Sequence, residues 1–245
     1  MQRVAVVTGA SSGIGRALAL ELARQGYAVG LTARREERLA AVARGIEAAG
    51  GCAAWAAADA GDRTATHAAI RSLEAALGPV DLLVANAGVG VSAPLLEPNP
   101  AEYEAMVAVN LLGPYYAFEA VVPAMVARGT GHLVAVSSIA AYITAAGSGQ
   151  YSATKAGLNQ WMDSVRLELH EHGIAVTTIN PGFVESEMTA QNDFKMPLLM
   201  SAEKAAGLMA NAIRKKKKVY DFPWRMSIAA RIAARLPDWV RRRLG

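Results

Sequence analysis

A tyrosine and a lysine four residues apart, Tyr151 and Lys155, are the pair in this 245-residue sequence best suited to proton transfer. Side chains at this spacing project from the same face of a helix, one turn apart. An ammonium group near a phenol favours the phenolate, so we expect the pKa of Tyr151 to lie below its ordinary value of about 10. Such a shift would suit a general acid/base. Taken without context, such a pair is more often made of surface or packing residues than of catalytic ones.

Ser138 directly follows the apolar run 132–137, which we predict to be a strand. Open α/β sheets bind their ligands outside the carboxyl ends of the strands. We therefore expect the Ser138 hydroxyl to hydrogen-bond a substrate carbonyl.

The segment from Thr8 to Gly15 reads TGASSGIG, follows a predicted strand and opens a predicted helix. In this context Gly9 permits a tight turn, Gly13 lets the backbone approach a pyrophosphate, and Gly15 allows close packing of helix on strand. The helix N-terminus presents free N–H groups to phosphate charge. The segment predicts a dinucleotide site; the alternative is a structural Gly/Ser turn.

The end of the second predicted strand chooses between the two nicotinamide cofactors. An acidic residue there usually binds the ribose 2′-hydroxyl of NAD, whereas arginine accommodates the 2′-phosphate of NADP. This sequence has Arg34 and Arg35 in that place, so NADP(H) is favoured over NAD(H). The alternative is that both arginines are solvated and pair with Glu36 and Glu37.

Short β-branched runs alternate with longer segments at helical spacing along the chain. This alternation predicts an α/β fold, a Rossmann-type doubly wound parallel sheet of six to seven strands flanked by helices in a single domain. We predict a catalytic domain over 1–222 and a C-terminal extension over 223–245. Strands are expected at 4–8, 28–32, 52–57, 82–85, 132–137, 175–180 and 219–221, and helices at 13–25, 36–49, 62–77, 102–128 (two helices), 151–172 and 201–215.

Composition excludes several classes. The single cysteine, Cys52, rules out an intrachain disulfide and a cysteine-based metal cluster, so we expect no metal site and a cytoplasmic protein. Apolar stretches are interrupted before the roughly 18 residues of a membrane span. The formal charge of +4 is uneven, because residues 211–245 hold eleven Lys/Arg and two Asp, or +9, which leaves −5 for 1–210. No nucleic-acid-binding motif accompanies this charge, so no nucleic-acid partner is expected.

Two apolar segments lie beyond the last glycine motif. Residues 183–200 include Met188 and Phe194 and suit a substrate lid, with Tyr142, Ile143 and the 89–96 loop as the other wall; an apolar carbonyl substrate or simple packing both fit. The extension mixes arginines with Trp224, Ile228 and Trp239. It suits either peripheral contact with an anionic membrane or packing on the domain or another subunit.

The order and spacing of these motifs, over residues 3–222, resemble the short-chain dehydrogenase/reductase family. The motifs are TGASSGIG at Thr8, NAG at Asn86, Asn110, Ser138, YSATK at Tyr151 and PG at Pro181. The resemblance implies a catalytic tetrad in which Asn110 holds a water, Ser138 orients the substrate, Tyr151 exchanges the proton and Lys155 binds the nicotinamide ribose. Asn110 is also open to a purely structural role, as a buried amide that satisfies backbone groups.

The resemblance also implies which residues surround the cofactor. Those residues are Gly9, Ser11, Ser12, Gly13, Ile14, Gly15, Arg34, Arg35, Asp59, Asn86, Ala87, Gly88, Asn110, Tyr151, Lys155, Pro181, Gly182, Val184 and Ser186. Three positions depart from the usual pattern: Ala85 replaces an asparagine, Ser186 replaces a threonine, and Ser12 stands where many NADP users have a basic residue. The last departure leaves the NADP prediction resting on Arg34 and Arg35.

The function predicted is an NADP(H)-dependent oxidoreductase that transfers a hydride between nicotinamide and an apolar carbonyl or alcohol, with Tyr151 as the general acid/base. The resemblance supplies the reductive direction, and it implies a homodimer or homotetramer formed through the helices at 102–128 and 151–172. The alternative is a non-catalytic NADP-binding sensor or scaffold, with the basic tail as a means of membrane contact.

Overall fold

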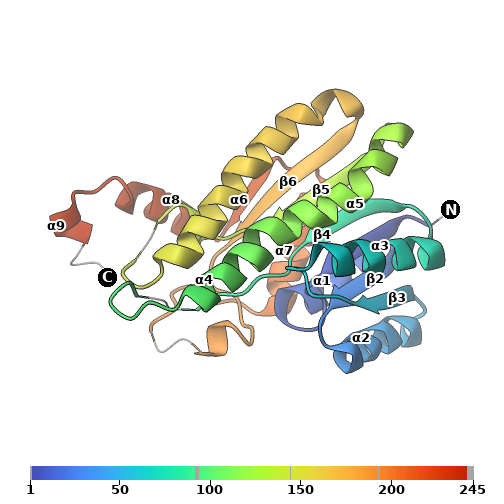
Figure 1. Ribbon diagram of the computed structural model, residues 1–245, viewed down its shortest axis with the longest axis horizontal. Helices are drawn as coiled ribbons and strands as arrows, with labels where there is room; N and C mark the ends of the chain where they lie inside the picture. Colours follow the sequence, from blue (N-terminus) through green and yellow to red (C-terminus); the bar gives the residue numbers. More distant parts are fainter. Residues whose placement is uncertain (1, 92–93, 144, 192–193, 242–245) are drawn as a thin grey trace.

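The computed structural model describes residues 2–91, 94–143, 145–191 and 194–241. Its described strands form one parallel sheet in the order β3-β2-β1-β4-β5-β6-β7 (Figure 1). The order reverses between β1 and β4, and a ligand crevice is expected beside their carboxyl ends. The strands are β1 (Val4–Thr8), β2 (Ala28–Ala33), β3 (Cys52–Ala57), β4 (Val80–Ala85), β5 (Gly131–Val136), β6 (Ile174–Pro181) and β7 (Val219–Phe222).

Helices cover both faces of the sheet. The helices are α1 (Gly13–Arg24), α2 (Glu36–Ala48), α3 (Arg63–Leu77), α4 (Pro100–Val107), α5 (Gly113–Arg128), α6 (Gly149–Glu168), α7 (Ala202–Arg214), α8 (Trp224–Ala233) and α9 (Asp238–Arg241). Helices α1, α2 and α7 share one hydrophobic core with the sheet, and α3, α5 and α6 share the other. Successive residues of β1 alternate between the cores, since Ala5 and Val7 belong to the first and Val6 to the second. The predicted doubly wound parallel sheet is confirmed.

The segment predicted as two helices over 102–128 is a continuous helical rod. It begins at Pro100, because the Asn99 side chain caps the first turn by accepting a hydrogen bond from the Glu102 backbone N–H. A π-helical turn, Ala108–Leu112, joins α4 to α5. Helix α6 starts at Gly149 and ends at Glu168, and the predicted end at 172 is a separate 3₁₀ turn, His170–His172.

The rod from Pro100 to Arg128 is long and apolar enough to cross a membrane by length and composition. Its inner face contributes Phe118, Val121 and Met125 to the second core. It is therefore a core helix of the folded domain, although its apolar stretch is longer than we expected from the sequence.

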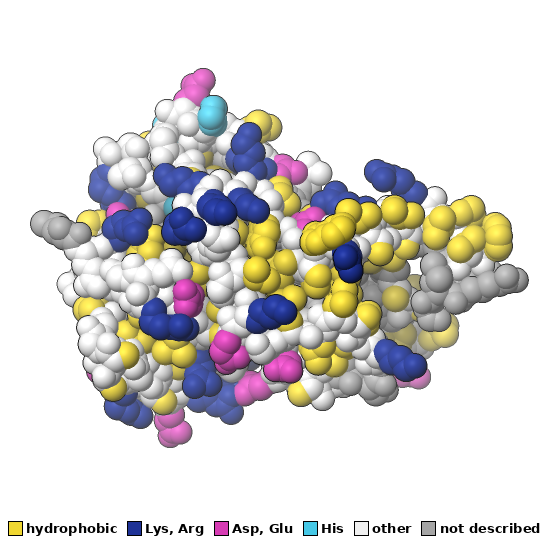
Figure 2. All heavy atoms as spheres, turned by 180° about the vertical axis from the view of Figure 1, so that it is seen from behind, with side chains coloured by type: hydrophobic (Ala, Val, Ile, Leu, Met, Phe, Trp, Pro, Cys, Tyr) yellow, Lys and Arg dark blue, Asp and Glu magenta, His cyan; other side chains and the backbone are white. Residues whose placement is uncertain are grey.

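The C-terminal helices α8 and α9 project from the body (Figure 1). Hydrophobic side chains gather on this projecting part in the view of Figure 2. One face of α8 is packed on the domain, where Ser227 and Ala230 are buried, while Trp224, Ile228 and Ile232 are each at least half exposed. One face of α8 is therefore packed on the domain, and the other face is exposed.

Candidate active site

Ser138 and Tyr151 meet at the carboxyl end of β5. Ser138 follows the strand and caps the short 3₁₀ turn Ile139–Ala141, its Oγ accepting a hydrogen bond of 3.0 Å from the Ala140 N–H. The Ser138 hydroxyl also lies close enough to Tyr151, in the first turn of α6, to lower the pKa of its phenol. A hydroxyl and a phenol at one point supply the two hydrogen bonds that a carbonyl oxygen needs during proton transfer.

The pKa of Tyr151 differs from the sequence expectation. Burial disfavours the phenolate and raises the pKa above its ordinary value, and the hydrogen bond from Ser138 lowers it only in part. The Lys155 ammonium does not reverse this balance, because it lies over the phenol ring, 5.9 Å from the centroid, and donates to the Val136 carbonyl at 3.1 Å. In the free chain Tyr151 therefore holds its proton at neutral pH.

Lys155 is itself strongly affected by its surroundings. Its residue is only 3% exposed, and burial lowers its pKa to about 8. A buried cation beside a partly buried phenol is costly unless a ligand uses it. This pair is the strongest chemical signal in the structure.

Asn110 lies in the π-helical turn and is fully buried. Its amide oxygen accepts from the Val89 N–H at 2.9 Å, and its amide nitrogen donates to the Val89 carbonyl at 2.8 Å and to the Thr154 hydroxyl at 3.1 Å. These bonds are those of the structural alternative, in which the side chain satisfies backbone groups. They also fix the loop after β4 beside the turn of α6 that carries Tyr151.

The glycine loop between β1 and α1 has the features required to receive a dinucleotide. Gly9 has φ +66°, and a Cβ there would lie 2.8 Å from the Ala87 Cα, while a Cβ at Gly15 would collide with the Gly9 carbonyl and the Asn86 amide. Ser12 is the N-cap residue of α1, but its side chain does not cap the helix. The first N–H groups of α1 therefore face an anion site, and Ile14 packs inward on the core.

The NAG segment after β4 supports that loop from the side. The Asn86 amide nitrogen donates to the Thr8 carbonyl at 2.9 Å, and the Ala87 N–H donates to the Thr8 hydroxyl at 3.0 Å. A Cβ at Gly88 would lie 3.4 Å from the Asn110 Oδ1 and 3.5 Å from the Lys155 Nζ. These contacts join the glycine loop to the catalytic residues.

The segment after β6 closes the site from a third side. The Gly182 N–H donates to the Phe222 carbonyl at 2.7 Å, so Pro181 and Gly182 are held by β7. Val184 is buried and bridges to Met200. A Cβ on Gly13 would lie 3.2 Å from that of Ser186, which places Ser186 against the glycine loop.

The two predicted cofactor arginines have different surroundings. The Arg34 side chain is 69% exposed and lies 4.0 Å from Asp59, whose other oxygen accepts from the Gly61 N–H. Arg35 turns toward the glycine loop and donates to the Ser11 hydroxyl at 2.9 Å and the Ser12 hydroxyl at 2.7 Å. Arg35 is therefore the arginine that faces the predicted phosphate site.

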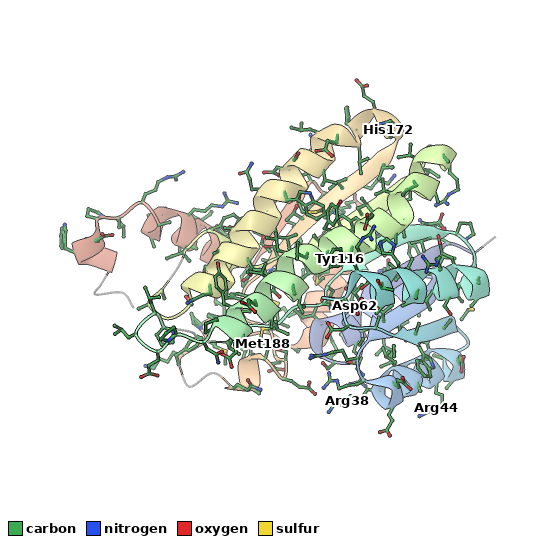
Figure 3. All side chains as sticks on the ribbon, viewed as in Figure 1. Arg38, Arg44, Asp62, Tyr116, His172 and Met188 are labelled. Carbon is green, nitrogen blue, oxygen red and sulfur yellow. The ribbon has the colours of Figure 1, made fainter. Side chains whose placement is uncertain are left out.

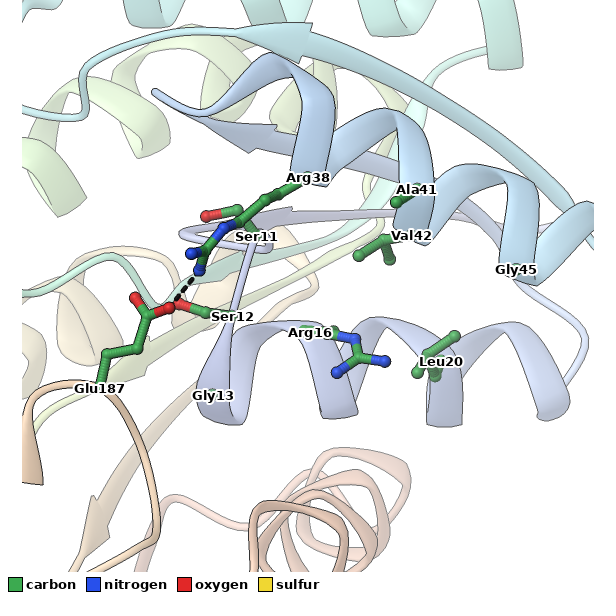
Figure 4. A pocket seen from close by; sticks show the side chains of 10 residues that line it. All are labelled: Ser11, Ser12, Gly13, Arg16, Leu20, Arg38, Ala41, Val42, Gly45 and Glu187. Atoms are coloured by element: carbon green, nitrogen blue, oxygen red, sulfur yellow. Dashed lines mark hydrogen bonds and ion pairs between the residues drawn. The ribbon is translucent and has the colours of Figure 1, made fainter. Parts of the chain in front are cut away.

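Sequence reasoning missed two members of this cluster, Arg38 and Glu187. The Glu187 carboxylate pairs with Arg35 at 2.6 Å and also with Arg38. Arg38 lies one helical turn after Arg35, a spacing that could have revealed it, whereas Glu187 comes from the far end of the chain. A cavity of about 450 Å³ opens here between α1 and α2, beside Arg16 and Ser12, and not at Tyr151 (Figure 4).

The substrate side is formed by the loop after β4 and the segment after β6. A Cβ on Gly90 would lie 3.0 Å from the Tyr151 ring and 3.4 Å from the Met188 sulfur. Met188 is labelled in Figure 3. Phe183 and Phe194 stack edge to face, with centroids 5.9 Å apart. Residues 92–93 and 192–193 of the two predicted walls lie outside the described residues.

Tyr142, predicted to line the substrate wall, belongs to a network centred on Asp221. Its hydroxyl donates to Asp221 at 3.0 Å, and Asn180 donates to both groups. From α8, Ser227 and Arg231 donate to the other Asp221 oxygen, and the Arg231 guanidinium covers the Tyr142 ring at 3.7 Å. The extension is thereby bonded to the segments that follow Ser138 and precede Pro181.

Known proteins resemble this chain over most of its length. The family profile described as short chain dehydrogenase matches residues 3–196. An uncharacterized oxidoreductase of Myxococcus xanthus is 42% identical over 236 residues, which is 96% of this chain and 93% of the relative.

Two solved structures are also similar. A metagenomic short-chain oxidoreductase crystallised with NADP is 39% identical with a TM-score of 0.76, covering 89% of this chain and 95% of that one. A variant of actinorhodin polyketide ketoreductase with NADPH is 27% identical with a TM-score of 0.83, covering 90% and 95%. The chain belongs to the short-chain dehydrogenase/reductase family of oxidoreductases.

Proposed function

We propose that this chain is an NADP(H)-dependent reductase of an apolar carbonyl compound, with Tyr151 as the general acid. The observation that carries the proposal is the proximity of Ser138, Tyr151 and the buried Lys155, joined through Gly88 to the glycine loop. In the reverse direction the same residues would oxidise the corresponding alcohol.

Each residue of the site has a separate role in the proposed reaction. The bound cofactor supplies the hydride. Ser138 donates a hydrogen bond that orients the substrate carbonyl, and Tyr151 donates its proton to the carbonyl oxygen. Lys155 binds the ribose hydroxyls and stabilises the phenolate that Tyr151 becomes. Asn110 holds the Val89 backbone, and with it the loop that covers the site.

The preference for NADP rests on Arg35 and Arg38 and no longer on Arg34. Two guanidinium groups and the Ser11 and Ser12 hydroxyls converge at the loop. Such a set suits a phosphate monoester, which carries close to two negative charges and three acceptor oxygens. The similar structures that contain NADP and NADPH support this assignment.

The preference for an apolar substrate rests on the side chains beside Tyr151. Met188 approaches Gly90 next to the phenol ring, and Phe183 and Phe194 stand in the same segment. A thioether and aromatic rings bind apolar surface and adapt to its shape. A panel of hydrophobic ketones, aldehydes and quinones is therefore the appropriate substrate set.

The first experiment follows cofactor oxidation with NADPH and with NADH over that panel. The proposal predicts turnover with a higher kcat/KM for NADPH. Saturable NADPH binding without turnover on any carbonyl or alcohol would favour the sensor or scaffold instead.

A matched pair of variants on α2 tests the cofactor assignment. Arg38 faces the cavity, while Arg44 is exposed six residues further along the same helix (Figure 3). Arg38→Ala should weaken NADPH binding by about tenfold and leave NADH binding within about twofold, because a charged hydrogen bond to phosphate contributes about 1.5 kcal/mol. Arg44→Ala should change neither. Equal losses in both variants would remove the assignment.

The extension supports a second candidate role, contact with an anionic membrane surface. Trp224 is 63% exposed and Ile228 is 50% exposed on one face of α8, with Arg225 beside them. Interfacial helices combine aromatic and aliphatic residues with cations in this way. Sedimentation with anionic liposomes should be lost in Trp224→Ser/Ile228→Ser. A truncation before Phe222 is unsuitable, since Phe222 is buried in the core.

Self-association as a dimer or tetramer is proposed through the outer faces of the long helices. Leu112 and Tyr115 are 40% and 47% exposed on the rod, and Leu167 is 79% exposed on α6. Light scattering of the purified chain measures the assembly directly, and a monomer at micromolar concentration would contradict it.

A further inference from the structure

The carboxylate of Glu187 occupies the position in which a phosphate would neutralise Arg35 and Arg38. It takes one oxygen to each guanidinium, and Arg35 keeps its remaining donors on Ser11 and Ser12. The hydrogen bonds from Arg35 and Arg38 lower the pKa of Glu187 to about 2, so the group is an anion throughout the physiological range. The chain thus fills its own anion site with a side chain.

This internal contact is of a kind that a ligand can displace. The side chains of Glu187 and Arg38 are both 52% exposed, and that of Arg35 is 41% exposed. Exposed ion pairs contribute little free energy because water screens them. A phosphate monoester brings more charge and more acceptors than a carboxylate to the same donors. The two anions cannot share the donors without repulsion.

The turn that carries Glu187 also reaches the catalytic side. Thr189 closes this 186–189 turn, its hydroxyl accepting from the Ser186 N–H at 2.9 Å and its own N–H donating to the Ser186 hydroxyl at 3.1 Å. Met188, the residue after Glu187, lies against Gly90, which borders the Tyr151 ring. At its base the segment is held by the Glu185 N–H, which donates to the Met200 carbonyl at 2.9 Å. Movement of Glu187 is therefore transmitted to Met188.

Taking the NADP assignment as its basis, we propose that Glu187 is a latch on the 2′-phosphate subsite. It holds the 186–189 turn against the glycine loop in the free chain and yields to the 2′-phosphate. The release shifts Met188 away from Gly90 and admits substrate to Tyr151. A cofactor that lacks the 2′-phosphate leaves the latch in place, so Glu187 selects for NADP through access of the substrate, although it lowers the affinity for the 2′-phosphate.

The test uses adenosine 2′,5′-bisphosphate, which carries the 2′-phosphate but no nicotinamide, with 5′-AMP as its counterpart. Calorimetric titration at low salt compares the wild type with Glu187→Gln and with Glu185→Gln, which removes the same charge two residues away. Glu187→Gln should bind the bisphosphate about fivefold more tightly, because the two exposed ion pairs of Glu187 with Arg35 and Arg38 no longer compete, and should bind 5′-AMP unchanged. Glu185→Gln should resemble the wild type.

Linkage supplies a second measurement on the unaltered chain, because a ligand that displaces Glu187 must loosen its turn. Hydrogen exchange of a peptide that covers 186–191 should accelerate on adding the bisphosphate and stay unchanged with 5′-AMP. Slower or unchanged exchange with the bisphosphate would overturn the latch.

The outcomes distinguish failure of the Glu187 latch from failure of the NADP assignment on which it rests. Equal or weaker bisphosphate binding by Glu187→Gln, with binding by the wild type intact, overturns the latch alone and leaves Glu187 as a group that orients the arginines. No bisphosphate binding by any variant, with 5′-AMP still bound, overturns the NADP assignment and the latch together.

Discussion

The glycine loop and the C-terminal arm (residues 221–233) both border the candidate site and are built differently. The loop is a short run of sequence whose backbone contacts leave no room for side chains, as at Gly9 and Gly15. The arm acts through side chains that meet across the fold, with Asp221 joining Tyr142 and Asn180 to Arg231. Steric requirements confined to a short segment leave a motif in the sequence, and a network of distant side chains does not.

The largest expected effect tests the chemistry that both regions serve. Tyr151→Phe removes the proton donor and retains the ring that Lys155 underlies. We expect kcat for carbonyl reduction to fall about 10³-fold, the usual contribution of a positioned general acid. Cofactor affinity, measured by fluorescence titration, should stay within about twofold. Comparable activity in the variant would show that another group donates the proton.

The second effect tests the loop. In Gly15→Ala the new Cβ collides with the Gly9 carbonyl, and overpacking of this kind costs about 2 kcal/mol. Gly207, on α7, is the matched control, because nothing lies within 4 Å of a Cβ there. Gly207→Ala should stabilise the chain by about 0.5 kcal/mol through helix propensity. Urea unfolding measures both, and NADPH binding should weaken only in Gly15→Ala.

The third effect tests the arm. Burial raises the pKa of Asp221, but hydrogen bonds from Ser227, Asn180, Arg231 and Tyr142 outweigh burial, so the net shift is downward. A lowered carboxyl pKa contributes stability above the unfolded value of about 3.9, and this contribution is lost as the pH falls through the folded value. Asp221→Asn should cost about 1.5 kcal/mol at pH 7 in urea unfolding.

The pH dependence of the stability difference is the control for the Asp221→Asn prediction. The difference between wild type and Asp221→Asn should shrink as the pH falls below about 4, where the wild-type carboxyl takes up its proton. A difference that stayed constant down to pH 3 would mean that the charge of Asp221 does not stabilise the arm.

The smallest effect concerns the outer face of the same arm. Trp224 and Ile232 are 63% and 57% exposed. Replacing either by serine should change the free energy of unfolding by less than about 0.5 kcal/mol. A larger loss for the isolated chain would show that this face is packed and not presented to a partner.

The same contrast explains what could be predicted from the sequence. The sheet, its order of strands and helices, and the placement of Ser138, Tyr151 and Lys155 follow from periodicity and from motifs in which each residue type has a local cause. The π-helical turn at Asn110 did not follow, because nothing in its five residues requires it. The pKa of Tyr151 was predicted in the wrong direction, since burial cannot be judged from a spacing of four residues.

Contacts between distant parts of the chain account for the rest. Arg35 and Glu187 are 152 residues apart, and Tyr142 and Asp221 are 79 apart. Neither pair has a shared motif. Such contacts arise because parallel strands bring the segments after β2, β5 and β6, and the carboxyl end of β7, to one edge of the sheet.

The role of Tyr151 as the general acid beside the Lys155 cation is tested most directly by the pH dependence of kcat/KM for NADPH-driven carbonyl reduction. The raised pKa of Tyr151 keeps its proton in place at neutral pH, and Lys155 loses its charge as the pH rises through about 8. We therefore expect kcat/KM to be constant through neutral pH and to fall above about pH 8, because the cation that stabilises the developing phenolate is lost. A rate that increases with pH through this range would contradict it.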